Sequence, residues 1–169
     1  MTLCTKSPPP PPPPFCKGLI ELNNLTIPSI IDLEEIGFRR GFIYRKLIII
    51  HGTATEPTNF DVSLVEDGVP EETADIPFRF SVDFATKDVI TDTWIYGKGW
   101  INKQRIESLP FTVGQEFELK FIAESKRHGL HVHVNERHFV SFYRSNLREI
   151  TQLEIKGAIK VRSVNLCPD

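Results

Sequence analysis

Apolar and polar residues alternate along much of the chain beyond residue 17. The clearest example is residues 78–84, in which every second residue is apolar and Arg79, Ser81 and Asp83 fall between the apolar positions. Successive side chains of a β-strand point to opposite faces of a sheet. The pattern therefore predicts a half-buried strand with one apolar face and one polar face.

Similar short runs, rich in β-branched and aromatic residues, recur along the rest of the chain and are separated by turn residues. Residues 66–75 hold Gly68, Pro70 and several acidic residues, and we expect a loop there. Because no helical segments alternate with these expected strands, the sequence favours an all-β sandwich or barrel. The other expected strands are residues 42–44, 47–50, 60–65, 89–96, 100–105, 117–123, 130–134, 139–143 and 150–164.

Seven consecutive prolines occupy residues 8–14. Because proline lacks a backbone N–H and restricts φ, we expect a stiff polyproline II segment that takes no part in a core. The expected organisation is a proline-rich tail over residues 1–17 and one domain over residues 18–169, a length that suits one core. The tail serves either as a spacer or as a docking site for a proline-recognising protein.

The charge balance is close to neutral, with 20 basic and 22 acidic residues and a formal charge of -2. We therefore expect neither nucleic-acid binding nor attraction to an anionic membrane. The longest apolar run, residues 47–50, is too short to insert in a membrane, and no signal-like segment begins the chain, which favours a cytosolic start. Cys4, Cys16 and Cys167 show no metal or disulfide spacing, and we expect free thiols.

Motifs for catalysis are absent, because the sequence has no glycine-rich phosphate loop, nucleophile elbow or zinc-binding helix motif. We predict a protein that is not an enzyme and that holds no cofactor. His131 and His133 share one strand face, with His128 and His138 nearby. A third ligand with motif-like spacing is missing, so we expect solvated histidines and no metal site.

A polar surface with one indole emerges when the strands over residues 78–84, 89–96 and 100–105 are placed side by side. Such a surface suits a carbohydrate, because sugar hydroxyls accept and donate hydrogen bonds while an aromatic ring covers the sugar's C–H groups. The expected members of this surface are Arg79, Ser81, Asp83, Thr91, Thr93, Trp100, Lys103 and Arg105.

The order and spacing of several motifs resemble those of the galectins over most of residues 19–166. The resemblance implies an antiparallel β-sandwich of two sheets, jelly-roll-like, that binds β-galactosides. It also implies a protein of the cytosol that can reach the outside by unconventional secretion, and it leaves a homodimer open. The motifs are Phe80-x-x-x-Phe84, Asp88-Val89-Ile90, Trp100-x-x-x-Gln104-Arg105, Leu109-Pro110-Phe111, Gly114-Gln115-x-Phe117-x-Leu119, Val132-x-Val134-Asn135, Phe142-Tyr143-Arg144 and Leu153-x-Ile155-x-Gly157.

Only part of the galectin sugar-binding pattern is retained. Trp100 and Arg105 match, whereas Arg79 stands for the family's His, Ser81 for Asn, Asp83 for Arg, Thr93 for the second Asn and Lys103 for Glu. Asp83 and Lys103 would carry the family's Arg and Glu charges in reverse. If the two side chains face each other, the site was remodelled as a unit, and if they point apart, decay of the site is the simpler account.

These substitutions lead to two hypotheses on function. The first is a lectin for a glycan or glycoprotein, with reduced or altered affinity for plain β-galactosides, through Arg79, Ser81, Asp83, Thr93, Trp100, Lys103 and Arg105. In this case, loss of the Trp100 ring should abolish binding. The alternative is a galectin-like scaffold that has lost sugar binding and mediates protein–protein interaction, with the proline tract as part of the docking surface.

Overall fold

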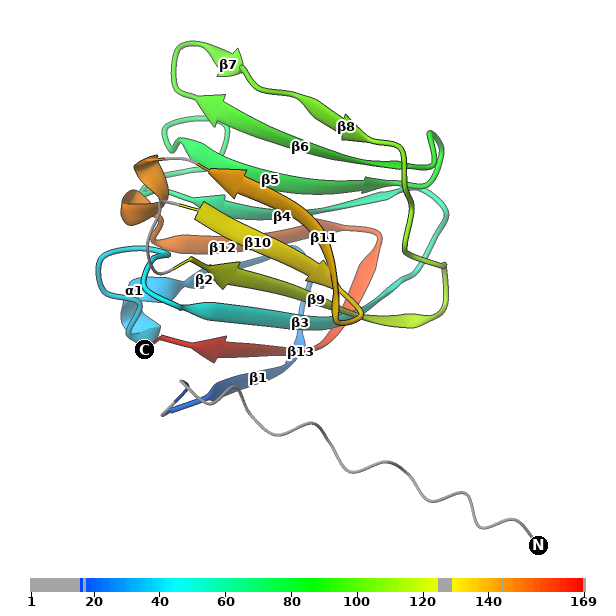
Figure 1. Cartoon of the computed structure of the whole chain (residues 1–169), viewed down its shortest axis with the longest axis horizontal. Helices are drawn as coiled ribbons and strands as arrows, with labels where there is room; N and C mark the ends of the chain where they lie inside the picture. The colour runs from blue at the N-terminus through cyan, green and yellow to red at the C-terminus, as the bar shows by residue number, and fades with distance from the viewer. Residues whose placement is uncertain (1–15, 17, 125–128, 144, 169) are drawn as a thin grey trace, which may run out of the picture.

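The computed structural model describes residues 16, 18–124, 129–143 and 145–168, which form two antiparallel β-sheets packed face to face (Figure 1). The expected two-sheet β-sandwich is confirmed. The first sheet has six strands in the order β1 (Ile20–Leu25), β13 (Ile159–Cys167), β3 (Leu47–Ala54), β9 (Glu116–Ala123), β10 (Gly129–Val134) and β11 (Arg137–Tyr143).

The second sheet has seven strands, six in one continuous order and a seventh that pairs with one of the six. Two short helices, α1 (Leu33–Ile36) and η1 (Ser145–Glu149), lie between strands. The strand order is β2 (Ser29–Asp32), β12 (Gln152–Gly157), β4 (Asn59–Val65), β5 (Ile76–Asp83), β6 (Asp88–Ile95) and β7 (Gly99–Trp100), with β8 (Gln104–Ile106) off this path.

The apolar positions of both sheets meet in one core. Phe78 and Phe80 of β5 are fully buried, as the alternation in this segment predicts. The Phe80 ring lies 6.2 Å from the Phe121 ring and 5.9 Å from the Phe139 ring, both on the opposite sheet, in edge-on geometry. Because the two sheets interlock through such aromatic contacts, β5 is held firmly and its polar face has a defined position.

Three of the expected strands differ from the structure. Residues 42–44 form a loop, and Phe42 is buried there because apolar content predicts burial without specifying the backbone. The strand expected over residues 100–105 is interrupted at residues 101–103, between β7 and β8. The long strand expected over residues 150–164 is two strands, because Gly157, with φ of 99°, lets the chain leave β12 and enter β13 in the other sheet.

The two ends of the described chain are joined by a disulfide between Cys16 and Cys167, whose Cα atoms lie 5.8 Å apart. The expectation of free thiols was wrong for this pair, and Cys4 lies outside the described residues. The reason is tertiary, because β1 pairs with β13 and places Ile20 opposite Leu166, which brings the ends of the chain together. Sequence spacing carries no trace of this contact.

None of the helices in the described ranges has the length and apolar character needed to cross a bilayer.

Candidate functional site

The polar face of the seven-stranded sheet is built by the register of β12, β4, β5 and β6. Because residues opposite each other in a sheet point to the same side, each row of partners forms one line across this face. One row is Glu154, Ser63, Arg79 and Asp92, and the next is Lys156, Asp61, Ser81 and Ile90.

Arg79 lies at the centre of this face, but its guanidinium group is held by the protein itself. Nε donates to Ser63 Oγ at 2.9 Å, Nη1 to Glu71 Oε1 at 2.5 Å and Nη2 to Glu154 Oε1 at 3.4 Å. Arg79 is only 8% exposed. The desolvation cost of burying this charge is offset because each nitrogen has an acceptor and two of the three acceptors are anionic.

The same guanidinium lies over the indole of Trp100, with its central carbon 4.5 Å from the ring centroid. Trp100 is 41% exposed and stands at the end of β7, where Trp94 of β6 is its partner. Stacking of this kind is favourable because the ring face is electron-rich. One face of the ring that was expected to cover a sugar is therefore covered by Arg79.

Glu71 reaches Arg79 from the loop between β4 and β5, which the sequence predicted as acidic and irregular. The loop is closed by Glu66 N–H donating to the Asp75 carbonyl, and Val69 O accepts from the N–H groups of residues 72–74. Glu71 also faces Lys156 Nζ, which lies 4.0 Å from Oε2. The loop thus places a carboxylate over the polar face of the sheet.

Burial and nearby carboxyl groups at the base of this loop raise the pKa of Glu66. Burial is the largest cause and the negative charge of Asp75 the next, and together with smaller contributions they raise the pKa of Glu66 from 4.5 to about 7. Glu66 is therefore partly protonated at neutral pH.

Ser81 and Asp83 are also engaged within the protein. The Ser81 hydroxyl donates to Asp61 Oδ1. Asp83 Oδ1 accepts from the backbone N–H of Ala85 at 2.9 Å and of Thr86 at 3.2 Å, which stabilises the turn after β5. Asp83 is therefore a turn-capping residue in this structure.

The positions of Thr91 and Thr93 differ from those expected. Thr91 lies opposite Phe80, on the apolar side of β5, and is buried. Thr93 is buried as well, and its hydroxyl donates to the Pro77 carbonyl at 2.9 Å. Asp92 occupies the polar row beside Arg79, because β5 and β6 pair in a register that sets Asp83 opposite Asp88 and Ser81 opposite Ile90. Period-two counting along β6 alone does not specify this register.

Lys103 and Arg105 lie beyond β6, at the edge of the sheet. Arg105 Nε lies 2.9 Å from Asp88 Oδ2, and the Asp88 side chain is almost completely buried. Lys103 is exposed on the segment between β7 and β8. Among the residues that the structure describes, no ion pair joins Lys103 to Asp83, so the expected reversal of a cross-sheet charge pair is not formed.

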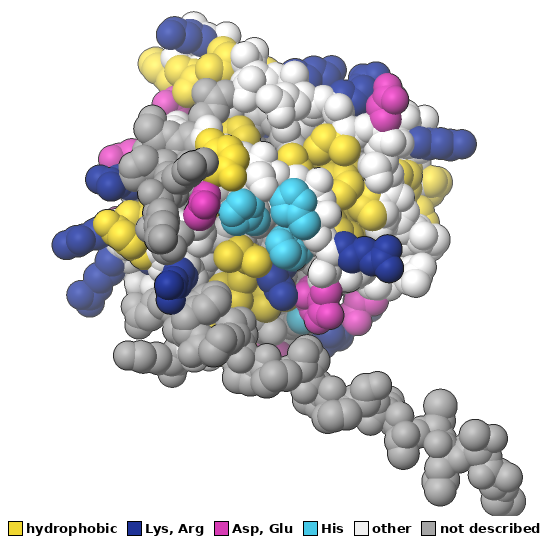
Figure 2. Space-filling model, in the orientation of Figure 1, with side chains coloured by type: hydrophobic (Ala, Val, Ile, Leu, Met, Phe, Trp, Pro, Cys, Tyr) yellow, Lys and Arg dark blue, Asp and Glu magenta, His cyan; other side chains and the backbone are white. Residues whose placement is uncertain are grey.

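Histidines gather on the outer face of the six-stranded sheet, over β10 and β11 (Figure 2). His131 Nδ1 and His138 Nε2 each lie 2.7 Å from Ser141 Oγ. Burial, followed by the charges of His138, Lys120 and His131, lowers the pKa of His133 below its usual 6.5. Within the described ranges, no group of three ligands is arranged to hold a metal ion, and His128 lies outside them.

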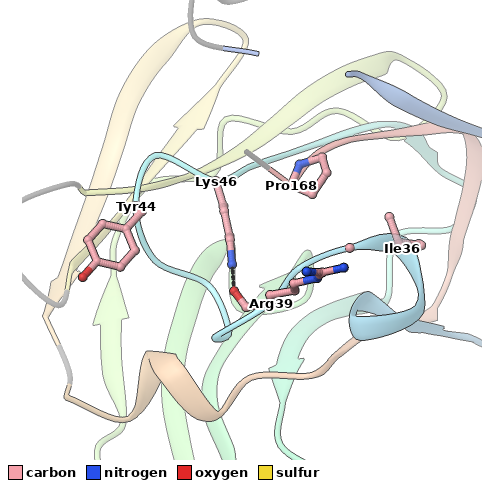
Figure 3. A pocket seen from close by; sticks show the side chains of 6 residues that line it. Ile36, Arg39, Tyr44, Lys46 and Pro168 are labelled. Atoms are coloured by element: carbon pink, nitrogen blue, oxygen red, sulfur yellow. Dashed lines mark hydrogen bonds between the residues drawn. The ribbon is translucent and has the colours of Figure 1, made fainter. Parts of the chain in front are cut away.

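An open pocket of about 640 Å³ lies at the end of the sandwich near the C-terminus, away from the polar face. Figure 3 shows Lys46 pointing between Tyr44 and Ile36 toward the carbonyl of Arg39, to which its Nζ donates. Lys46 is buried and also donates to the Gly41 carbonyl at 2.8 Å. Its hydrogen bonds to the backbone indicate that it holds the loop over residues 37–46.

Sequence reasoning found Arg79, Ser81, Asp83, Trp100 and Arg105 on or beside this face, but it missed several of their partners. Asp61 and Ser63 sit in an alternating strand whose polar face could have been predicted. Glu154 and Lys156 alternate in the same way, and only the pairing of β12 with β4 brings them to Arg79. Glu71 comes from a loop, for which periodicity provides no signal.

Comparison with known proteins gives one consistent result. The family model of galactoside-binding lectins matches residues 35–166. Human galectin-4 is 30% identical over 120 residues, covering 70% of this chain and 36% of that protein, and mouse galectin-3 is 31% identical over 145 residues, covering 83% and 50%. The chain thus spans half or less of the length of these relatives.

Solved structures agree on the fold. The Caenorhabditis elegans galectin LEC-6 superposes with a TM-score of 0.71 at 24% identity, covering 86% of this chain and 94% of that one. Sheep galectin-11, solved in complex with glycerol, has a TM-score of 0.70 at 24% identity, covering 84% and 99%. At this identity the likeness concerns the fold alone.

Proposed function

Since this chain belongs to the galactoside-binding lectin family, we propose that it binds glycans on the polar face of its seven-stranded sheet, with low affinity for plain β-galactosides. The galectins are lectins and not enzymes, and we extend the absence of catalysis to this chain. The family match supports glycan binding, and the stacking of Arg79 on Trp100 is the observation that supports low affinity for plain β-galactosides. This contact leaves a lectin scaffold in which the aromatic platform is partly occupied from within.

Two effects oppose ordinary β-galactoside binding. A sugar that stacks on the covered side of Trp100 must first displace the guanidinium, which also has hydrogen bonds to Ser63, Glu71 and Glu154. In addition, a ligand hydroxyl that finds no partner when buried costs roughly 1 to 3 kcal/mol. Because Asp83 caps a turn and Thr93 is buried, the family's contacts at these positions have no replacement.

Other groups on the face remain able to bind hydroxyls. Asp61 with Ser81 is an acceptor–donor pair, and Arg105 is an exposed donor, that a polyhydroxylated ligand can join. Exposed Lys103 and the uncovered part of Trp100 adjoin them. We therefore place the glycan over β4, β5, β6, β7 and β8.

The test is a glycan array with the wild type, Trp100→Ala and Tyr143→Ala, the last as a control because Tyr143 is an exposed aromatic residue on the other sheet. We expect Trp100→Ala to abolish binding of the retained glycans and Tyr143→Ala to leave it unchanged. Lactose should rank low among the wild-type ligands.

The second candidate function is protein–protein interaction by a scaffold without sugar binding, and the coverage of Trp100 by Arg79 favours it too. If the wild type binds no glycan on the array, the result favours this alternative over the first. Glycan binding that survives Trp100→Ala would contradict the role proposed for Trp100. We propose that residues 18–169 form the binding domain, to which the disulfide joins Cys16. The proline tract is a spacer under the first function and part of the docking surface under the second.

The disulfide leads to a proposal on location. Disulfides persist in oxidising compartments and are rare in the cytosol. We therefore propose that the form joined through Cys16 and Cys167 works outside the cell, and that any cytosolic pool is reduced. Alkylation of the protein from both places before unfolding, followed by peptide mass spectrometry, measures the proportion of each form.

A further inference from the structure

The surroundings of Glu71 have the geometry of an anion-binding site. Its two carboxylate oxygens face different cations: Oε1 accepts from Arg79 Nη1 at 2.5 Å, and Oε2 lies 4.0 Å from Lys156 Nζ. The two cations come from different strands, β5 and β12, and converge on one carboxylate from a loop. A carboxylate or a sulfate ester of a ligand has the same charge and the same spread of oxygens.

We propose that Glu71 occupies, within the free protein, the position that the anionic group of a glycan takes when it binds, so that the ligand class is an acidic glycan bearing a carboxylate or a sulfate ester. This proposal rests on the proposed function, because it concerns the same polar face. Arg79 is then a specificity-determining residue, and Glu71 is an internal competitor.

Differences in burial show which of the two carboxylates on Arg79 can be exchanged. The Glu154 side chain is 11% exposed and projects from the sheet, whereas that of Glu71 is 38% exposed and projects from a loop. The Glu71 contact is the shorter of the two, but solvent reaches its carboxylate and screens the pair, and the loop side chain gains freedom on release. Glu71 can therefore leave while Glu154 and Ser63 keep the guanidinium in place.

Local charge then favours an anion. Without the Glu71 carboxylate, the two cations keep one ion pair among the described residues, that of Arg79 with Glu154, and Lys156 keeps none there. The other acids of these two rows have hydrogen-bond donors of their own, because Asp92 accepts from the N–H groups of Thr93 and Asn102, while Asp61 accepts from the Ser81 hydroxyl. The guanidinium also keeps its place on Trp100, next to which the remainder of the glycan would lie.

The first experiment asks whether the anion site exists, independently of any sugar. Sodium sulfate is titrated against sodium chloride at equal ionic strength, and the Arg79 Nε–Hε signal is followed by NMR. The variant Glu71→Gln removes the competing charge, and Glu72→Gln is the matched control, because Glu72 is an exposed glutamate of the same loop without an ion pair to Arg79 among the described residues. We expect saturable, sulfate-specific shifts that strengthen only in Glu71→Gln.

The second experiment measures the affinities of lactose, lactose 3′-sulfate and 3′-sialyllactose by calorimetry, which separates sulfate from carboxylate recognition. Glu71→Gln should raise affinity for the charged sugars about fivefold, the scale of one exposed ion pair, and change lactose less than twofold. Lys156→Gln should lower affinity for the charged sugars by a similar factor.

The outcomes separate this proposal from the lectin function itself. Equal effects of Glu71→Gln and Glu72→Gln on the charged probes would overturn the anion site, because they would reflect overall charge alone, even if neutral glycans still bind. A sulfate-dependent shift at Arg79 without affinity for any glycan would leave the anion site standing and refute the lectin function.

Discussion

Reduction of the disulfide between Cys16 and Cys167 should destabilise the domain by about 3 to 5 kcal/mol. The bond joins positions 151 residues apart, so it restrains nearly the whole described chain in the unfolded state. It also ties down the edge strand β1, which is paired only with β13. Reduction should therefore loosen β1 first.

The magnitude follows from the length of the closed loop. The chain-entropy relation gives about 5 kcal/mol for a loop of this size at 25 °C, and residual structure in the unfolded state lowers the measured value. The Cys167 side chain is fully buried and packs with Leu47 and Ile49, and reduction removes no atom from this cluster except the S–S link. The change thus reflects the lost restraint more than lost packing. Domains of this kind have total stabilities of about 5 to 15 kcal/mol, so the loss should be large.

The assay is urea unfolding followed by tryptophan fluorescence, with oxidised and reduced samples of the same protein. A Cys4→Ser background prevents alternative pairing during the experiment. Cys16→Ser serves as a permanent reduced form, because Cys16 is only partly buried and its replacement disturbs the packing less than that of Cys167. Peptide mapping under non-reducing conditions confirms which sulfurs are joined.

Equal unfolding midpoints of the oxidised and reduced samples, once mapping has shown the bond to be present, would refute the role assigned to the restraint. Mapping of the wild type, which retains Cys4, would refute the pairing itself if it joined Cys16 to Cys4 instead of Cys167.

Two further predictions concern the base of the acidic loop and the core. Glu66 has a raised pKa, so the folded state binds more protons than the unfolded state between pH 4.5 and about 7. The free energy of unfolding should therefore decrease as the pH rises from 4.5 to about 7. Allowing for solvent screening, the fall is about 1 to 2 kcal/mol, and urea unfolding at several pH values should show it in the wild type and find it missing in Glu66→Gln. Phe80→Ala removes a fully buried ring between the sheets and should cost about 3 to 5 kcal/mol in the same assay, whereas a loss below 1 kcal/mol would contradict the packing described.

The alternation of residues 78–84 was sufficient to predict β5 and both of its faces. A strand has only two sides, so the apolar series Phe78, Phe80 and Val82 determines where Arg79 and Ser81 point. The galectin motifs then identified the family and the fold, and the family model confirms them. Features of this kind can be predicted from the sequence because they depend on the spacing of neighbouring residues.

Counting alternate residues failed for β6, because it does not specify the register in which β6 pairs with β5. Thr91 was assigned to the polar face, yet it lies opposite Phe80, and Asp92 is the residue beside Arg79. The sequence left open whether Asp83 and Lys103 face each other. In the structure Asp83 caps the turn that follows it, and the strand is interrupted at Lys103. Of the two accounts that the sequence left open, separate orientations agree with decay of the family's charge pair.

The sequence by itself determined the alternating strands, the family and the presence of Arg79 and Trp100 on one surface, because these depend on local spacing. Only the tertiary structure decided that Arg79 covers Trp100 and is held by Glu71 and Glu154, since loop, sheet order and register bring these groups together over long separations. The disulfide between Cys16 and Cys167 also depends on tertiary structure, because the pairing of β1 with β13 brings the two cysteines together.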